Sequence, residues 1–209
     1  MIRIQLTILS VLLLLLGSNV LAADQLSRVL ILGDNFYQGL TGSTATQLKG
    51  RAQVVWADPG DSSYALANLD VLLGKDKWDV IHFNLGLADL YYKDPSIKGI
   101  RAMSKSVGGV RVTSPELYQK NLIELVRRLK ATGAKLIWAS TVPSKSINYD
   151  PDSEIEYNTI ASKVMSAQKV SENDMHAFAI ACAKEKKVAQ FQEPFLKAIL
   201  SKIEPLEKY

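Results

Sequence analysis

The sequence is poor in the residues that build disulfides and imidazole sites. Its 209 residues include one cysteine, Cys182, so the chain cannot form an internal disulfide. Its two histidines, His82 and His176, are the only imidazoles available for any chemistry. Neither the Gly-x-Gly-x-x-Gly pattern nor the Gly-x-x-x-x-Gly-Lys phosphate loop occurs. The net charge of +4 is too small to indicate a nucleic-acid partner.

The first 22 residues have the pattern of a secretory signal peptide. Arg3 precedes an apolar run over residues 8–16, and the small residue Ala22 predicts cleavage directly after it. The run is shorter than the roughly 20 apolar residues of a membrane span, although a retained anchor is the alternative. We therefore expect a single domain over residues 23–209, secreted or periplasmic, with no membrane attachment and a net charge of about +3 once Arg3 is removed.

The most informative stretch is residues 28–35. Residues 29–32 are continuously apolar and end at Gly33-Asp34-Asn35, which is typical of a buried strand in a parallel sheet. In open α/β sheets, ligands bind outside the carboxyl ends of the strands. We therefore expect Asp34 and Asn35 at the mouth of a site.

Strand-like and helix-like segments alternate along the rest of the chain. Strands are expected at residues 53–56, 78–84 and 135–139, with a weak one near Val170. Helices are expected after Asn35 and at residues 64–73, from a Thr113 cap to Gly133, and at about 154–167, 174–186 and 194–203. This alternation predicts an α/β fold: a three-layer α/β/α sandwich with a mainly parallel five-stranded sheet. Residues 93–112 form a long connection, either a lid or a locally disordered loop.

Several motifs resemble the SGNH/GDSL hydrolase superfamily, the GDSL-like lipases and esterases. Gly33-Asp34 matches the start of its Gly-Asp-Ser block, and residues 78–90 match its third strand and the block that follows. Similarity continues over residues 118–122, 129–139, 141–143, 157–158, 164–165 and 173–178, so it covers most of residues 28–203. The resemblance implies the flavodoxin-like fold of SGNH hydrolases and, in an active member, a serine-type ester hydrolase.

The resemblance also implies where the catalytic groups should lie. In the family, a serine attacks an acyl carbonyl, and a histidine oriented by an aspartate accepts the serine proton. Asn35 occupies the serine position, and Val188 and Gln190 occupy the aspartate and histidine positions. An amide nitrogen is no nucleophile because its lone pair is delocalised. The catalytic positions are therefore degenerate.

The oxyanion positions are only partly retained. A glycine amide and an asparagine hold the oxyanion in the family. Gly60 keeps the glycine, whereas Ala88 replaces the asparagine and has no donor. Asp34 and Asp89 also remain. We expect these four residues to line a residual cleft beside Asn35, under residues 93–112, with no metal and no cofactor.

The sequence predicts an exported pseudo-hydrolase that binds a small acyl or carbohydrate ligand in this cleft. The first alternative is an active, divergent ester hydrolase that uses Ser62 or Ser63 as nucleophile and His176, in Asp174-Met175-His176, as base. His82, inside an apolar strand, is expected to be a core histidine. The second alternative is a structural or partner-binding exported domain. The sequence leaves the oligomeric state open.

Overall fold

A computed structural model describes residues 26–97, 102–144, 146, 148–187 and 189–203. The expected signal peptide lies outside the described residues. Within the described part, no helix is long and apolar enough to cross a membrane.

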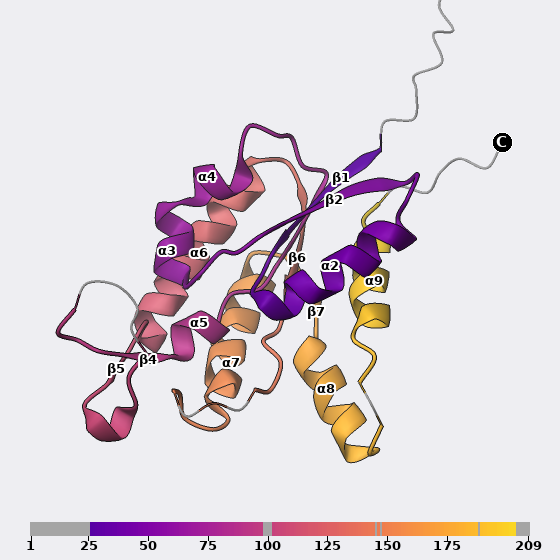
Figure 1. Cartoon of the computed structure of the whole chain (residues 1–209). Helices are drawn as coiled ribbons and strands as arrows, with labels where there is room; N and C mark the ends of the chain where they lie inside the picture. Colours follow the sequence, from indigo (N-terminus) through magenta and orange to yellow (C-terminus); the bar gives the residue numbers. More distant parts are fainter. Residues whose placement is uncertain (1–25, 98–101, 145, 147, 188, 204–209) are drawn as a thin grey trace, which may run out of the picture.

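Five parallel strands form one sheet, in the order β2-β1-β3-β6-β7 (Figure 1). The strands are β1 (Ser27–Leu32), β2 (Ala52–Ala57), β3 (Val80–Phe83), β6 (Lys135–Ala139) and β7 (Ser171–Asn173). All four expected strands and the weak fifth one are present, the fifth one residue later than Val170. The predicted five-stranded parallel sheet is therefore confirmed.

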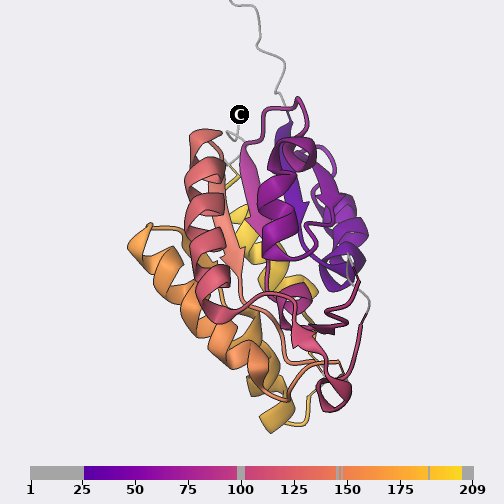
Figure 2. The ribbon, with the colours of Figure 1, turned by 90° about the vertical axis from the view of Figure 1, so that its left-hand side faces the viewer.

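Helices cover both faces of the sheet because successive strand residues point in opposite directions. In β1, Val29 and Ile31 pack on one side, where the helices are α2 (Asn35–Gln47), α8 (Met175–Lys184) and α9 (Gln192–Leu200). Leu30 and Leu32 pack on the other side, against α3 (Ser62–Ala67), α4 (Leu69–Leu73), α6 (Pro115–Ala131) and α7 (Ser153–Ala167). Figure 1 shows the two helical layers with the sheet between them, and Figure 2 looks onto the layer that contains α6 and α7. The three-layer α/β/α prediction is confirmed.

Two local expectations were wrong. The helix expected over residues 64–73 is divided into α3 and α4 at Asn68, whose backbone N–H and side-chain amide both donate to the Tyr64 carbonyl, at 3.0 and 2.9 Å. The cap of α6 is Ser114 and not Thr113. Because Pro115 is the first helical residue, the cap position is the residue before it, and Ser114 Oγ accepts from the Leu117 N–H.

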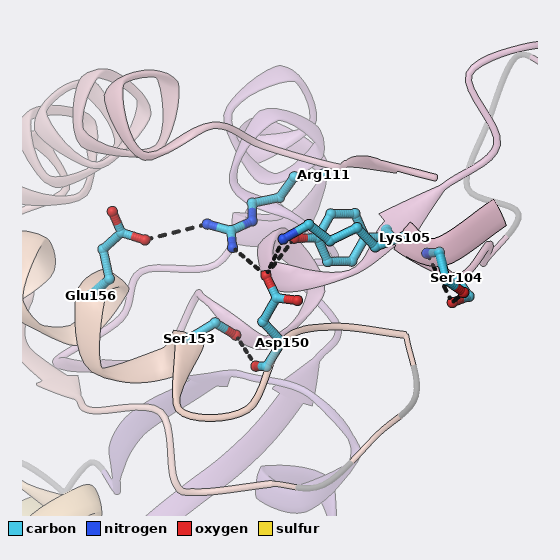
Figure 3. Close-up of polar contacts among 8 residues, drawn as sticks. Ser104, Lys105, Arg111, Asp150, Ser153 and Glu156 are labelled. Carbon is cyan, nitrogen blue, oxygen red and sulfur yellow. Dashed lines mark hydrogen bonds and ion pairs between the residues drawn. The ribbon is translucent and has the colours of Figure 1, made fainter. Parts of the chain in front are cut away.

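The described part of the connection over residues 93–112 is ordered around an antiparallel pair, β4 (Tyr92–Lys93) and β5 (Val110–Arg111), with a short 3₁₀ helix, η1 (Lys105–Val107). Its polar contacts converge on Asp150, in the segment before α7 (Figure 3). Asp150 accepts from the Tyr92 hydroxyl at 2.6 Å and from Lys105 Nζ at 3.0 Å, and it pairs with Arg111 at 3.6 Å. These contacts hold the described part of the connection beside the start of α7 rather than over Asn35.

Candidate functional site

The carboxyl ends of β1, β2 and β3 are aligned at one edge of the sheet. Leu32 of β1 is in register with Ala57 of β2 and with Phe83 of β3. The Gly33 N–H donates to the Ala57 carbonyl at 3.3 Å, and the Asn84 N–H donates to the Leu32 carbonyl at 2.8 Å. The chain therefore leaves these three strands side by side, in the segments that lead to Asn35, Gly60 and Ala88.

Asn35 begins α2 directly after β1, and it is exposed. Asp34 caps this helix and accepts from the Phe36 N–H at 2.9 Å. Burial raises the pKa of Asp34, and the nearby Asp58 carboxylate acts in the same direction. Gly33 is required because a Cβ there would lie 2.8 Å from the Tyr37 side chain. Gly33 and Asp34 thus form the start of α2: Gly33 lets Tyr37 approach the backbone, and Asp34 caps the helix.

The two oxyanion positions lack the donors that the family pattern implies. The Gly60 N–H, the amide that would correspond to the family's oxyanion donor, donates to Asp58 Oδ1 at 2.9 Å. Ala88 lies in α5 (Leu87–Leu90) and its methyl side chain carries no hydrogen-bond donor. The sequence analysis missed the role of Asp58, although an aspartate two residues before a glycine is a common turn signal.

Asp89 does not line a cleft, which corrects the expectation for this residue. Its exposed fraction is 0%, and its Oδ1 accepts from the Ser62 N–H at 2.9 Å and from the Ser62 hydroxyl at 2.6 Å. The Asn121 amide on α6 donates to both Ser62 Oγ and Ser63 Oγ, at 3.0 and 2.9 Å. Burial raises the pKa of Asp89 to about 6, although the hydrogen bonds from Ser62 act to lower it. Asp89 therefore ties α5 to α3 and α6 inside the protein.

His82 is buried in the sheet. Its exposed fraction is 0%, and its ring lies 4.5 Å from the Phe195 ring, centroid to centroid. Its Nε2 is 3.3 Å from the Asn173 amide nitrogen, a geometry in which a neutral imidazole accepts the hydrogen bond. Desolvation by burial lowers the pKa of His82 to about 3. The ring is therefore neutral and enclosed at pH 7.

His176 faces a carboxylate rather than a serine of α3. Its backbone N–H donates to Ser140 Oγ at 2.9 Å, and its Nε2 lies 3.6 Å from Glu154 Oε1. Ser62 is buried and its proton is directed to Asp89, whereas α3 and α8 are well separated in both Figure 1 and Figure 2. The described residues therefore do not bring Ser62 and His176 together as nucleophile and base.

The final block returns to the neighbourhood of Asn35. Val188 lies outside the described residues, and Gln190 is exposed. The next residue, Phe191, packs edge-on against Phe36 with ring centroids 4.9 Å apart. The segment before α9 thus lies beside the start of α2, where a family member would need its histidine.

Glu154 is a feature that the sequence analysis missed. It is 3% exposed although it is an acidic residue. The signal was its helical spacing: Glu154 stands three residues before Tyr157 and seven before Ala161, both buried residues of α7. This spacing places Glu154 on the buried face of that helix.

Comparison with known proteins supports the fold assignment through structure alone. No family model matches the sequence, and no curated protein matches it. A lipase/acylhydrolase from Enterococcus faecalis superposes with a TM-score of 0.66 at 12% identity, over 88% of this chain and 100% of that one. The acetyl xylan esterase AlAXEase gives 0.62 at 13% identity, over 85% and 100%. A GDSL-like lipase from Bacteroides thetaiotaomicron gives 0.58 at 14% identity, over 85% and 87%.

The chain has an SGNH/GDSL-like fold. Among proteins with this fold that these comparisons found are lipases and esterases. At such low identity the likeness extends to the fold and not to the activity. In this SGNH/GDSL-like chain, the edge that would carry the esterase centre has Asn35, an engaged Gly60 amide and Ala88.

The buried Asp89 predicts an unusual dependence of stability on pH. The folded protein holds the Asp89 proton up to about pH 6, whereas an unfolded chain releases it near the ordinary pKa of 3.8. Rising pH between these values therefore favours unfolding. Relative to Asp89→Asn, which keeps an acceptor for Ser62 but cannot ionise, the wild type should lose about 2 kcal/mol of unfolding free energy from pH 4 to pH 7.

Urea denaturation of both proteins across this range measures the difference. Comparing the two proteins removes the contribution of His82, whose lowered pKa acts in the opposite direction in both. Asp76→Asn is the control: Arg28 lowers the pKa of the exposed Asp76, so this substitution removes a contribution that is nearly constant above about pH 4, and its stability curve should run parallel to that of the wild type from pH 4 to pH 7. Parallel stability curves for the wild type and Asp89→Asn would contradict the assignment.

Proposed function

We propose that this protein is an exported SGNH-fold protein without serine-esterase activity, which uses the edge beside Asn35 to bind a small acyl or carbohydrate ligand. The proposal rests on one observation: Asn35 is exposed and follows the carboxyl end of β1. In the SGNH/GDSL hydrolases that the sequence resembles, this position holds the nucleophilic serine. An asparagine there can donate and accept hydrogen bonds but cannot attack an ester.

The surroundings of Asn35 support a non-catalytic role. Of the two histidines, His82 is enclosed in the core and His176 faces Glu154. The Gly60 amide donates to Asp58, and Ala88 has no donor. The described residues at this edge therefore offer no evident nucleophile, general base or pair of oxyanion donors. The exposed Asn35 amide and Asp58 carboxylate remain there as hydrogen-bonding groups.

The ligand class follows from the resemblance and from the structural neighbours. Acetyl xylan esterases and lipase/acylhydrolases share the fold. A chain that has lost the chemistry of such proteins can retain affinity for the acyl or carbohydrate group. The rival, a divergent esterase with Ser62 or Ser63 and His176, has no support in the observed contacts of Ser62, Asn121 and His176.

Export is the second part of the proposal. It rests on the signal-peptide pattern of residues 1–22, which lies outside the described residues. We expect amino-terminal sequencing of the protein recovered from the periplasm or the medium of its producing cell to begin at Ala23. Retention of Met1 would replace secretion with a membrane anchor.

The central prediction concerns the substitution Asn35→Ser. The wild type should hydrolyse p-nitrophenyl acetate and butyrate no faster than a heat-denatured sample, and Asn35→Ser should remain at this level. A missing general base costs about 10²–10⁴-fold, and a missing oxyanion donor costs about 10²–10³-fold. Initial rates of p-nitrophenol release measure the effect.

A combined variant tests whether the last block is aligned correctly. Asn35→Ser with Val188→Asp and Gln190→His restores all three triad residue types, so it should be the first variant to exceed the background. The matched control adds the same two substitutions to Asn35 without the serine. Robust turnover by Asn35→Ser alone would mean that a working base already exists, and the pseudo-hydrolase proposal would fail.

A further inference from the structure

A cavity lies at the carboxyl edge of the sheet, after β6, and Asn35 is not among its lining residues. Its volume is about 790 Å³, within the range of about 300–1,000 Å³ that is typical of small-molecule sites. Its described lining residues lie between β6 and α7 and in the first turn of α7. Its walls include Pro143, Tyr149 and Pro151, with Asp152 and Glu154 as acidic groups.

Glu154 is the chemical centre of this cavity. It is 3% exposed, and its Oε1 lies 3.6 Å from His176 Nε2. Its Oε2 has no hydrogen-bond partner among the described residues. Burial raises the pKa of Tyr149, and the Glu154 carboxylate acts in the same direction. Both residues line the cavity. A buried carboxylate oxygen without a donor is costly and is stabilised by any ligand that supplies one.

The wall of the cavity is held in place before any ligand arrives. Asp150, between Tyr149 and Pro151, accepts from Tyr92 and Lys105, and its carbonyl accepts from the Ser153 hydroxyl at 2.7 Å (Figure 3). The Tyr92 N–H donates to the Asn148 carbonyl at 2.7 Å. The β4–β5 pair thus fixes the segment that carries Tyr149, which reduces the ordering needed on binding.

We propose that this cavity binds a small primary amine with an apolar body, and that its ammonium group donates to Glu154 Oε2. An ammonium has three donors and the charge opposite to the carboxylate, and such charge-assisted hydrogen bonds are about twice as strong as neutral ones. Asp152 adds a second negative charge at the wall, while Pro143, Pro151 and the Tyr149 ring suit an alkyl or aromatic body. This site is separate from the edge beside Asn35.

Three ligands of equal length test the charge preference. Isothermal titration of the purified protein with hexylamine, hexanol and hexanoate, in phosphate buffer at pH 7 without any amine, should give 1:1 binding for hexylamine. Hexanol should bind about tenfold more weakly, because it lacks the charge, and hexanoate should give no measurable binding. Equal affinity for hexanol or hexanoate, or no binding of hexylamine at 10 mM, would overturn the proposal.

Two variants locate the site. Glu154→Gln should weaken hexylamine binding by about tenfold or more, whereas Glu193→Gln, at an exposed position on α9, should leave it unchanged. If Glu154→Gln does not fold, as judged by circular dichroism, Asp152→Asn in the exposed wall should still weaken binding about two- to threefold. Unchanged affinity in a folded Glu154→Gln, or in Asp152→Asn where that substitutes for it, would overturn the site. Esterase rates play no part in this test, so it stands or falls independently of the role of Asn35.

Discussion

The parallel pairing of β1 with β2 and β3 determines where the segments that carry Asn35, Gly60 and Ala88 leave the sheet. Because Leu32 is in register with both Ala57 and Phe83, the chain must leave all three strands at one edge. Asn35, Gly60 and Ala88 are brought together by this register and not by contacts of their own. The same edge continues past β6 and β7, where it provides the cavity around Glu154. The parallel arrangement of the strands thus places both the surroundings of Asn35 and the cavity around Glu154 at the carboxyl edge of the sheet.

Several polar groups at or near this edge form hydrogen bonds or packing contacts inside the protein. Asp89 draws α5 toward α3 and α6 through Ser62, and burial keeps its pKa high. Asp58 accepts from the Gly60 amide. His82 is neutral among aromatic rings. Each of these groups has a partner or an enclosure that stabilises the fold, and each is thereby removed from the chemistry that a hydrolase would need.

The fold was predictable because its signals are local and repeated. Continuous apolar runs ended by Gly33-Asp34 or by Pro-Gly turns indicated buried parallel strands, and Pro115 fixed the start of α6 to within a residue. The alternation of strands and helices was sufficient for the three layers.

The site was less predictable, because the burial and partners of a side chain are set by distant segments. No local pattern indicated that Asp89 points into the core, or that the β4–β5 pair is anchored to Asp150 in the connection to α7. The helical spacing of Glu154 with Tyr157 was a usable signal. The oxygen that has no partner among the described residues, and the cavity beside it, depend on the tertiary structure.

The absence of an activated serine is the central claim, and a fluorophosphonate probe tests it without knowledge of any substrate. Such a probe phosphonylates a serine whose proton is removed by a neighbouring base, with loss of fluoride. Intact-mass spectrometry of the folded protein after treatment with excess probe should show the unmodified mass, while an active serine esterase treated in parallel is modified completely. Stoichiometric modification of a single serine, lost when the protein is unfolded beforehand, would contradict the account.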